Sequence, residues 1–560
     1  MTVVNIWKKN AASMFSKSQQ TILSAATIIM VSVAASRLLG LIRLRLLAYY
    51  FGSQIKILDA FIAANVLPEA IFEILIFGAV SVAFIPVFTS YLAKNEKKVA
   101  WDLADSVLNL GVLGFAAVAL LLIIFAPLLP QFLSPGLVRN YPEFNGLIAN
   151  LMRVMIFAQI FFVGSAFLTG ILQSFQFFLL PAMAAVLYNL GIIFGIVVLS
   201  PFLGIYGPAW GMVIGAILHL LIQIPLARKL GARFRLKINF HHPGLARIII
   251  LMVPRSFGLA ILWTNDIVSV ALASLLISGS IVAFNFAETL YLVPLGLFAA
   301  SIAQAALPTL SLTFAQGRMR EFKDTFLNSF HQILFLVLPS AAILAILRVP
   351  VVRLVYGAKQ FPWDSTVLTG RTLIVFSIGL TAAAVNLILV RGFYALHDTK
   401  TPVAINVFTV FINIFLSILF IVVLKKNVLW LAGSCSAADI LNALALLFFL
   451  DRKVEKFSRK HLILPALKMG TAALLMAISL YVPMKLLDQL VFDTTHTLGL
   501  IALTGIASFF GIFVYVSLTL IFRVKEAIYC LQFLRKITNI KNLTIISEIV
   551  EPSPQKPPNL

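Results

Sequence analysis

Three arginines lie within one strongly apolar stretch near the N-terminus, residues 36–52, which reads SRLLGLIRLRLLAYYFG. A charged side chain at membrane depth costs at least about 2.5 kcal/mol on insertion scales, so it lines a wet cavity or has a partner. Guanidinium groups bind phosphate in a bidentate manner and do not lose their proton. Arg37, Arg43 and Arg45 are therefore predicted to bind a large anion, and a pyrophosphate-linked lipid fits their number and spread in depth.

Further ionisable residues interrupt other apolar segments. Glu69 and Glu73 are four residues apart, so they share one helix face and are the nearest partners for the arginines. Arg45 has an alternative, because its long side chain can extend to the outer headgroups. Arg255 has one too, because Pro254 breaks the helix and frees carbonyls that this arginine can satisfy. The other candidates at membrane depth are Asp266, Glu288 and Asp439.

The elements that must position these side chains are membrane-spanning helices. Of the 560 residues, 61% are hydrophobic and only 11% are charged, and the mean hydropathy is +1.01. Soluble domains are about half apolar and about one quarter charged. The chain is therefore predicted to be an all-α polytopic membrane protein with 14 transmembrane helices. The expected spans are 21–50, 57–90, 101–129, 147–170, 178–200, 205–229, 244–276, 280–313, 326–347, 370–394, 400–424, 430–450, 462–486 and 497–522.

The distribution of basic residues predicts the orientation. An even number of spans places both termini on one side, and most of the 43 lysines and arginines fall in segments on that side. Basic residues collect on the cytoplasmic side of membrane proteins, so both termini are predicted to be cytoplasmic, in the cytoplasmic membrane. The net charge of +22 is accordingly interpreted as a topology and lipid-headgroup signal, with no nucleic-acid partner.

A weak internal repeat at an offset of roughly 220 residues predicts two pseudo-symmetric six-helix lobes followed by two C-terminal helices. YNLGIIFGIVV resembles FINIFLSILF, and SVAFIPVFTS resembles SIAQAALPTLS. In transporters built from such repeats, the substrate site lies between the lobes near the midplane. The predicted parts are an N-terminal segment (1–20), the N-lobe (21–229), a basic linker (230–243), the C-lobe (244–450), a C-terminal helix pair (451–522) and a cytoplasmic, partly disordered tail (523–560).

The sequence carries none of the catalytic motifs of soluble enzymes. It has no P-loop, no HExxH zinc motif and no cysteine cluster. His219 lies alone in an apolar span and is interpreted as a satisfied polar residue. The chain is therefore predicted to be a transporter, not an enzyme, that uses a gradient or the membrane potential.

Several long stretches resemble those of one known family. The arginine stretch, FAETLYLVPLGLFAASIAQAALPTLS, VVRLVYGAKQF and RGFYALHDTKTPVAINV are similar to segments of the MurJ/MviN family of lipid II flippases, within a superfamily that includes multidrug and polysaccharide exporters. The resemblance covers roughly residues 20–520. It implies a monomer with two lobes around a cationic cavity. It also implies that the substrate is lipid II, the undecaprenyl-pyrophosphate-linked peptidoglycan precursor, moved to the outer leaflet by alternating access for cell-wall synthesis.

The resemblance also assigns roles to residues. The cavity arginines of the family match Arg37 and Arg43, its outer acidic residue matches Asp59, and its last two helices are thought to form a groove for the lipid tail. Glu69, Glu73, Asp266 and Glu288 are expected to gate or to pair charges alongside Asp59. This chain departs from the family where many members carry arginines after the second-helix proline, since it has Phe72 and Glu73 there. Arg45 and Arg255 are expected to compensate for the missing cations.

A sodium site is a further implication of the resemblance. Some relatives bind Na⁺ with an asparagine and an aspartate four residues apart in the eleventh helix. Here that pair is Asn413 and Ser417, without the acid, and Asp439 is the expected substitute. A structural role for Asp439 is an equal alternative. Na⁺ is thus an expected coupling ion, and no other cofactor is expected.

Three other functions remain open. A flippase for another polyprenyl-pyrophosphate oligosaccharide, of the O-antigen or teichoic type, would explain the changed cavity charges. A multidrug exporter is disfavoured, because cationic drugs would meet several arginines. A membrane scaffold that recruits cell-wall enzymes would need the basic tail and not the arginines.

Overall fold

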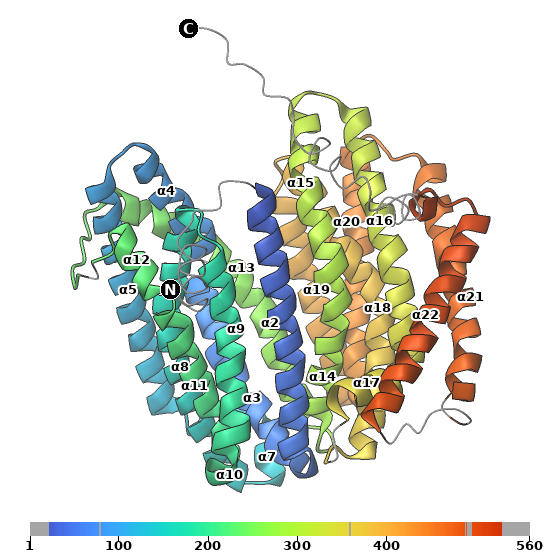
Figure 1. The fold of residues 1–560 in the computed structure, drawn as a ribbon, viewed down its shortest axis with the longest axis horizontal. Helices are drawn as coiled ribbons and strands as arrows, with labels where there is room; N and C mark the ends of the chain where they lie inside the picture. Colours follow the sequence, from blue (N-terminus) through green and yellow to red (C-terminus); the bar gives the residue numbers. More distant parts are fainter. Residues whose placement is uncertain are drawn as a thin grey trace, which may run out of the picture. The chain divides into compact units, whose positions relative to one another are not determined.

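The computed structural model describes residues 22–77, 80–233, 235–357, 360–487, 489 and 496–528. Most of the chain in these ranges is helical, and none of it forms a strand (Figure 1). The predicted N-terminal segment 1–20 and most of the predicted tail 523–560 lie outside the described residues.

Twelve helical segments in the described part are long and apolar enough to cross a membrane. They are α5 (Lys97–Phe125), α8 (Glu143–Ser174), α9 with α10 (Leu179–Leu203), α11 with α12 (Tyr206–Leu230), α13 (Pro243–Ser274), α14 with α15 (Ser280–Ala315), α16 (Met319–Ile346), α18 (Trp363–Ala395), α19 with a π-helical end (Lys400–Val423), α20 (Val428–Lys453), α21 (Arg459–Leu486) and α22 (Thr497–Ile521). This confirms the polytopic all-α class.

The first two predicted spans have helical counterparts as well. Span 21–50 corresponds to α2 (Ile22–Phe51). Span 57–90 corresponds to α3 (Ile55–Phe72), the π-helical segments η2 (Glu73–Phe77) and η3 (Val80–Phe84), and α4 (Ile85–Ala93). The total of fourteen spans stays a prediction. Short helices lie between the longer ones: η1 (Gly52–Gln54), α6 (Pro130–Leu133), α7 (Pro135–Asn140) and α17 (Arg348–Tyr356).

π-helical turns recur at the positions of the internal repeat. The segment η4 (Gly195–Leu199) follows α9, and η6 (Leu419–Val423) follows α19, 224 residues later. The segments η3 and η5 (Leu295–Ala299) start 215 residues apart. Single π-turns are rare in helices, so their recurrence near the offset of roughly 220 residues supports a structural repeat.

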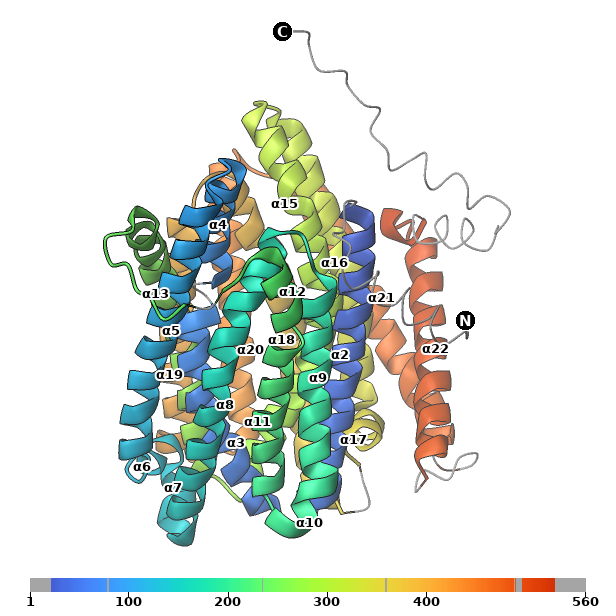
Figure 2. The ribbon, with the colours of Figure 1, turned by 60° about the vertical axis from the view of Figure 1, so that its left-hand side comes forward.

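By packing, the chain divides into two compact units. Unit 1 comprises Met1–Leu290, Val349–Phe376 and Val403–Ala438, and unit 2 comprises Tyr291–Arg348, Ser377–Pro402 and Asp439–Leu560. In unit 1, α2 runs along α9, and α3, α5 and α11 each pack on α8 (Figures 1 and 2). In unit 2, α21 packs against both α16 and α22. An aromatic cluster in the core of unit 1 joins η3, α4, α5 and α8, and it includes Phe84, Phe88, Phe115 and Phe167.

Helices α9 and α11 approach closely because glycines line both sides of their contact. Gly207, Gly211 and Gly215 recur every four residues along α11, and they face Gly191 and Gly195. A Cβ atom added at Gly191 would lie 2.4 Å from Cα of Gly215, and one at Gly195 would lie 2.5 Å from Cα of Gly211. Small residues at this spacing let membrane helices pack backbone to backbone.

We predict that Gly211→Ala destabilises the protein, because the new methyl group would meet the backbone of Gly191, Ile192 and Gly195 at 2.9–3.0 Å. Overpacking of this kind costs about 1–3 kcal/mol. The thermal unfolding midpoint of the detergent-solubilised variant should therefore be lower than that of the wild type. The matched control is Gly114→Ala, where no atom lies within 4 Å of the added methyl group. An unchanged midpoint for Gly211→Ala would contradict the close packing.

The connection between α18 and α19 is organised by one carboxylate. Asp398 accepts hydrogen bonds from the backbone N–H of Thr401 at 3.0 Å and from its hydroxyl at 2.7 Å, and Lys453 Nζ lies 2.6 Å away. Asp398 thus caps the first turn of α19 and joins it to α20. Burial opposes ionisation of Asp398, but the hydrogen bonds from Lys453 and Thr401 outweigh it and lower the pKa of this carboxyl group to about 2.

The lowered pKa predicts a pH-dependent stability contribution from Asp398. Because the unfolded carboxyl titrates near about 3.9, the stabilisation is complete above that pH and is lost as the pH falls toward about 2. At pH 7, Asp398→Asn should lower stability by about 0.5–1 kcal/mol, because asparagine can still accept from Thr401 but has no charge to pair with Lys453. The difference between the thermal unfolding midpoints of the variant and the wild type should shrink as the pH is lowered from 7 to 3. A difference that stays constant over this range would refute the charged cap.

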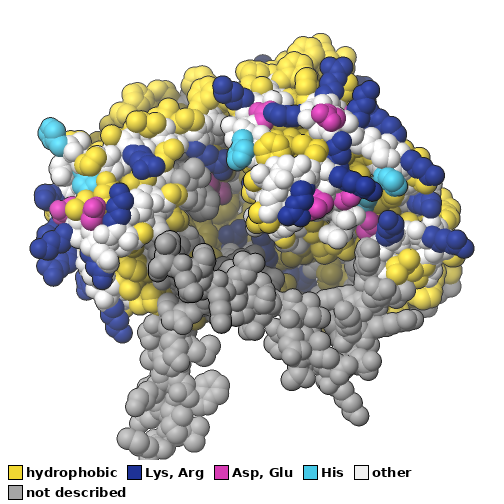
Figure 3. All heavy atoms as spheres, turned by 90° about the horizontal axis from the view of Figure 1, so that it is seen from above, with side chains coloured by type: hydrophobic (Ala, Val, Ile, Leu, Met, Phe, Trp, Pro, Cys, Tyr) yellow, Lys and Arg dark blue, Asp and Glu magenta, His cyan; other side chains and the backbone are white. Residues whose placement is uncertain are grey.

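Basic side chains are exposed at one helix connection in each unit, α4–α5 in unit 1 and α15–α16 in unit 2. In the space-filling view, lysine and arginine side chains are spread over the described surface, with fewer acidic side chains (Figure 3). Exposed basic residues of these connections include Lys94, Lys97, Lys98, Arg318 and Arg320. Basic connections are typical of the cytoplasmic side of membrane proteins, and the orientation of this chain stays a prediction.

Candidate functional site

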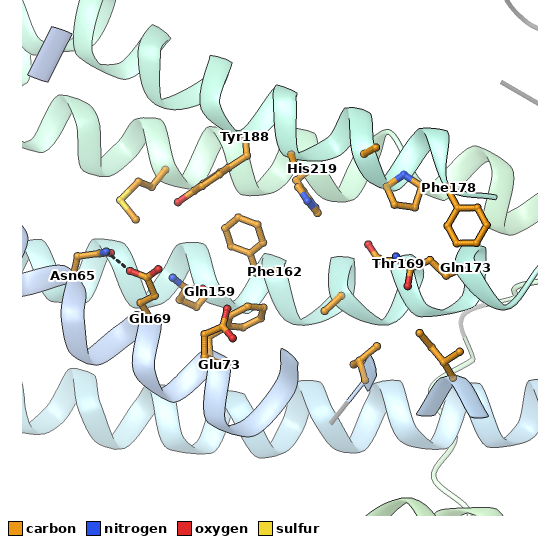
Figure 4. Close-up of a pocket in the computed structure, with 18 residues that line it drawn as sticks. Asn65, Glu69, Glu73, Gln159, Phe162, Thr169, Gln173, Phe178, Tyr188 and His219 are labelled. Atoms are coloured by element: carbon orange, nitrogen blue, oxygen red, sulfur yellow. Dashed lines mark hydrogen bonds between the residues drawn. The ribbon is translucent and has the colours of Figure 1, made fainter. Parts of the chain in front are cut away.

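A pocket of about 750 Å³ opens within unit 1, between α3 and η2 on one side and α8, α9 and α11 on the other (Figure 4). Its size is that of a small-molecule site. Aromatic rings of Phe72, Phe162 and Phe178 form part of its wall. The polar lining residues are Asn65, Glu69, Glu73, Gln159, Thr169, Gln173, Tyr188 and His219.

The two predicted glutamates both line this pocket. Glu69 and Glu73 lie one helical turn apart, at the end of α3 and the start of η2, and their side chains point toward the same space (Figure 4). Asn65, one turn earlier, donates a hydrogen bond of 2.7 Å to Glu69 Oε2. The spacing predicted from the sequence thus produces a shared acidic face.

Two predicted arginines act on these glutamates without lining the pocket. Arg43 of α2 is half-buried and interacts electrostatically with Glu69. Arg255 of α13 is exposed and interacts with Glu73. Asp266, half-buried on α13, adds a repulsive interaction with Glu69. The structure therefore brings five predicted residues into one charged cluster. Across the described ranges, no ion pair within 4.0 Å joins them.

The other predicted site residues of α2 and α14 lie elsewhere. Arg37 is exposed on α2. Arg45 is half-buried, and its guanidinium donates a hydrogen bond to the backbone carbonyl of Leu354. This contact within unit 1 holds α2 to α17. Glu288 is half-buried in α14.

A hydrogen-bonded ladder fixes the far wall of the pocket. His219 Nδ1 and Ser165 Oγ are 2.5 Å apart, so His219 is a satisfied polar residue, as the sequence indicated. Gln223 Nε2 donates to Ser165 Oγ at 2.8 Å, and Thr169 Oγ1 donates to Gln223 Oε1 at 2.9 Å. Gln223 is fully buried. These bonds hold α8 against α11 and orient the polar lining.

Sequence reasoning missed most of the neutral lining residues. Gln159, Thr169, Gln173 and Tyr188 carry no charge, and single polar residues in apolar spans give no distinctive signal. Only the position of α8 relative to α9 and α3 shows that they face one cavity.

The predicted outer acid, Asp59, closes a contact between distant segments of unit 1. It is 2% exposed, and its carboxylate accepts hydrogen bonds from the backbone N–H groups of Gly279 at 2.6 Å and Val282 at 2.9 Å, at the start of α14. Nearby, the N–H of Gly136 donates to Ser274 Oγ at 3.1 Å. Segments more than 130 residues apart in the sequence are thus joined within unit 1, and a gating role for Asp59 stays a prediction.

We expect Asp59→Ala to loosen this closure, because each buried N–H left without a partner costs about 1–3 kcal/mol. In a background without Cys435 and Cys530, a cysteine introduced by Ser278→Cys would report opening through a membrane-impermeant maleimide. Labelling should speed up by about fivefold or more. The control is Asp364→Ala, an exposed residue at the start of α18. Equal labelling of Asp59→Ala and wild type would rule out a closing role for this carboxylate.

The candidate cation residues belong to different packing units, Asn413 and Ser417 to unit 1 and Asp439 to unit 2. In unit 1, Asn413 Nδ2 donates to Asn265 Oδ1 at 2.6 Å, and Ser417 Oγ lies 2.6 Å from Ser434 Oγ. In unit 2, Tyr291 donates to Asp439 Oδ2 at 2.8 Å. The unit 1 network supplies amides and hydroxyls that pair with one another, and the carboxylate of Asp266 adjoins it through a side-chain hydrogen bond with Asn265. A sodium site at Asn413, Ser417 and Asp439 therefore stays a prediction.

Comparisons with known proteins agree with this architecture. The family model described as "Lipid II flippase MurJ" matches residues 47–501. A probable lipid II flippase MurJ of Bdellovibrio bacteriovorus is 27% identical over 512 residues, covering 89% of this chain and 97% of the relative. A solved structure of lipid II flippase MurJ in an inward closed conformation has a TM-score of 0.72 at 26% identity, over 89% of this chain and 98% of that one. An inward-facing MATE family multidrug transporter shares the fold, at 13% identity and a TM-score of 0.57, over 79% of this chain and 96% of that one.

Proposed function

Because this chain belongs to the MurJ family of lipid II flippases, we propose that it moves lipid II from the inner to the outer leaflet of the cytoplasmic membrane. The observation that carries the proposal is the family match over residues 47–501, with the structural likeness to a lipid II flippase over 89% of the chain. The protein acts as a multi-pass transporter with both termini in the cytoplasm. It works as a monomer and supplies precursor for cell-wall synthesis.

The arginines of α2 and α13 bind the pyrophosphate of the substrate. Arg37 and Arg255 are exposed, and Arg43 is half-buried, so their guanidinium groups are accessible without local unfolding. Glu69 and Glu73 balance two of these charges when no substrate is bound. An arriving pyrophosphate offers bidentate acceptors that compete with this weaker, longer-range attraction.

The Asp59 contact provides a closed state on the outer side. Two backbone hydrogen bonds and the adjacent Gly136–Ser274 contact must break together before the outer end opens. Breaking these bonds as a unit gives the outer end a closed and an open arrangement, which is what alternating access requires. Binding of substrate or a change in membrane potential shifts the balance between them.

The lipid tail follows the C-terminal helix pair. Helices α21 and α22 lie side by side in unit 2 (Figures 1 and 2) and expose large apolar side chains. The most exposed include Leu474, Ile478, Leu498, Phe509 and Ile521. Such a surface is compatible with surrounding lipid and with a bound polyprenyl chain.

We predict that Arg37→Ala or Arg43→Ala fails to support growth after depletion of the native flippase, at normal membrane levels of the protein. Loss of one charge-assisted, bidentate contact costs about 1.5–3 kcal/mol, or roughly 10- to 100-fold in affinity. The control is Arg320→Ala, an exposed arginine at the start of α16. Leaflet-specific detection of lipid II should show accumulation on the inner side.

Full growth with both alanine variants would count against the proposed role of the arginines. A binding comparison between lipid II and an O-antigen-type lipid tests the substrate directly. Preference for the O-antigen-type lipid would assign the protein to the other polyprenyl-pyrophosphate substrates.

A further inference from the structure

The charge of the 750 Å³ pocket in unit 1 is opposite to that needed for a pyrophosphate. Its lining, all within the described residues, contains Glu69 and Glu73 but no lysine or arginine. The nearest cations, Arg43 and Arg255, act on these glutamates from outside the lining. An anionic group entering the pocket would meet two carboxylates at close range. The pocket therefore selects a different part of the substrate.

Two polar groups in the pocket lack partners. Gln159 is 4% exposed, and its side chain points into the cavity between Glu69 and Phe162 (Figure 4). No hydrogen bond joins the Gln159 side chain to the described part of the chain. Asn65 donates to Glu69, but its buried Oδ1 has no partner there either. Buried polar groups are normally paired, so each marks a place where a ligand atom is expected.

The acceptors of the pocket call for a ligand that carries several N–H donors. Asn65 Oδ1, Gln159 Oε1 and the carboxylates of Glu69 and Glu73 are acceptors, and the amide NH2 of Gln159 is a donor that can bind an oxygen of the same headgroup. A primary ammonium group has three donors and a positive charge, and can satisfy acceptors on more than one helix. The rings of Phe162 and Tyr188, with centroids 4.8 Å apart, add aromatic surface of the kind that stabilises cations.

We propose that this pocket binds a primary ammonium group carried by the peptide part of the lipid-linked headgroup, with Glu69 and Glu73 as its counter-ions. The inference rests on the proposed flippase function and adds a specificity determinant to it. Arg43 and Arg255 lie next to the pocket and the acids lie inside it, so the site presents cations to the pyrophosphate and anions to the peptide amine. A cavity of about 750 Å³ accommodates part of the headgroup.

The residue types at two lining positions keep the pocket open and acidic. Phe72 and Glu73 both line the pocket, next to Glu69. An arginine at either position would pair with Glu69 and fill the space. The apolar ring and the acid instead leave a negatively charged cavity open.

The test compares two forms of lipid II, one with a free side-chain amine on its peptide and one with that amine N-acetylated. The full-length protein in nanodiscs should bind the free-amine form about tenfold or more tightly, because acetylation removes the charge and two donors. The double variant Glu69→Gln with Glu73→Gln should bind both forms equally. Gln at position 69 keeps an acceptor for Asn65.

The matched control is Glu143→Gln, because Glu143 is an exposed acid in the first turn of α8 that does not line the pocket. This variant should keep the wild-type ratio of the two affinities, free-amine lipid over acetylated lipid. Equal binding of both lipids by the wild-type protein would overturn the inference and leave the flippase proposal intact. Failure to bind either lipid would overturn the flippase proposal and the inference with it. If the double variant keeps the wild-type affinity ratio but transports lipid II more slowly, the inference is also overturned. The carboxylates would then be assigned to the coupling of transport to its energy source. The affinity ratio is measured first on the wild-type protein, so this part of the test does not depend on whether a variant folds.

Discussion

The absence of water in the hydrocarbon core is the constraint on which the rest of this structure depends. Each polar or charged group at membrane depth must find its partner inside the protein. Arg45 meets this demand through the carbonyl of Leu354, and Asp59 meets it through two backbone N–H groups of α14. Both contacts join segments distant in the sequence. Charges that would be costly alone thus become the links that hold separate helices together.

Close helix packing makes such links possible. The glycines of α9 and α11 bring two backbones together, and the ladder from Ser165 to Gln223 fixes α8 against α11. With these walls fixed, the opposite wall of α3 and η2 leaves a defined space between them. Glu73 begins the π-helical segment η2, one turn after Glu69 in α3, and π-turns are common at functional sites. The shape of the pocket therefore follows from small residues and backbone irregularities that have no chemistry of their own.

Charge separation is the central feature of the proposed site. The arginines stand outside the pocket and the acids stand inside, and they attract one another without a direct ion pair among the described residues. A direct pair would be hard for a substrate to displace. A weaker, longer-range attraction leaves the arginines and the glutamates free to bind a substrate without breaking a strong ion pair. This suits a headgroup that carries an anionic link to its lipid and a cationic peptide.

The sequence by itself determined the membrane class, the helical architecture, the family and the charged candidates, because apolar length and charges at membrane depth are local properties. The pairing of Glu69 with Glu73 on one face followed from spacing alone. Only the tertiary structure decided that Gln159, Tyr188 and His219 share a pocket with them, since neutral residues on separate apolar helices carry no joint signal. It alone showed that Asp59 caps a helix some 220 residues later and that Arg45 satisfies a carbonyl. Such contacts depend on how helices are packed, and that packing is set by many weak interactions summed over the whole chain.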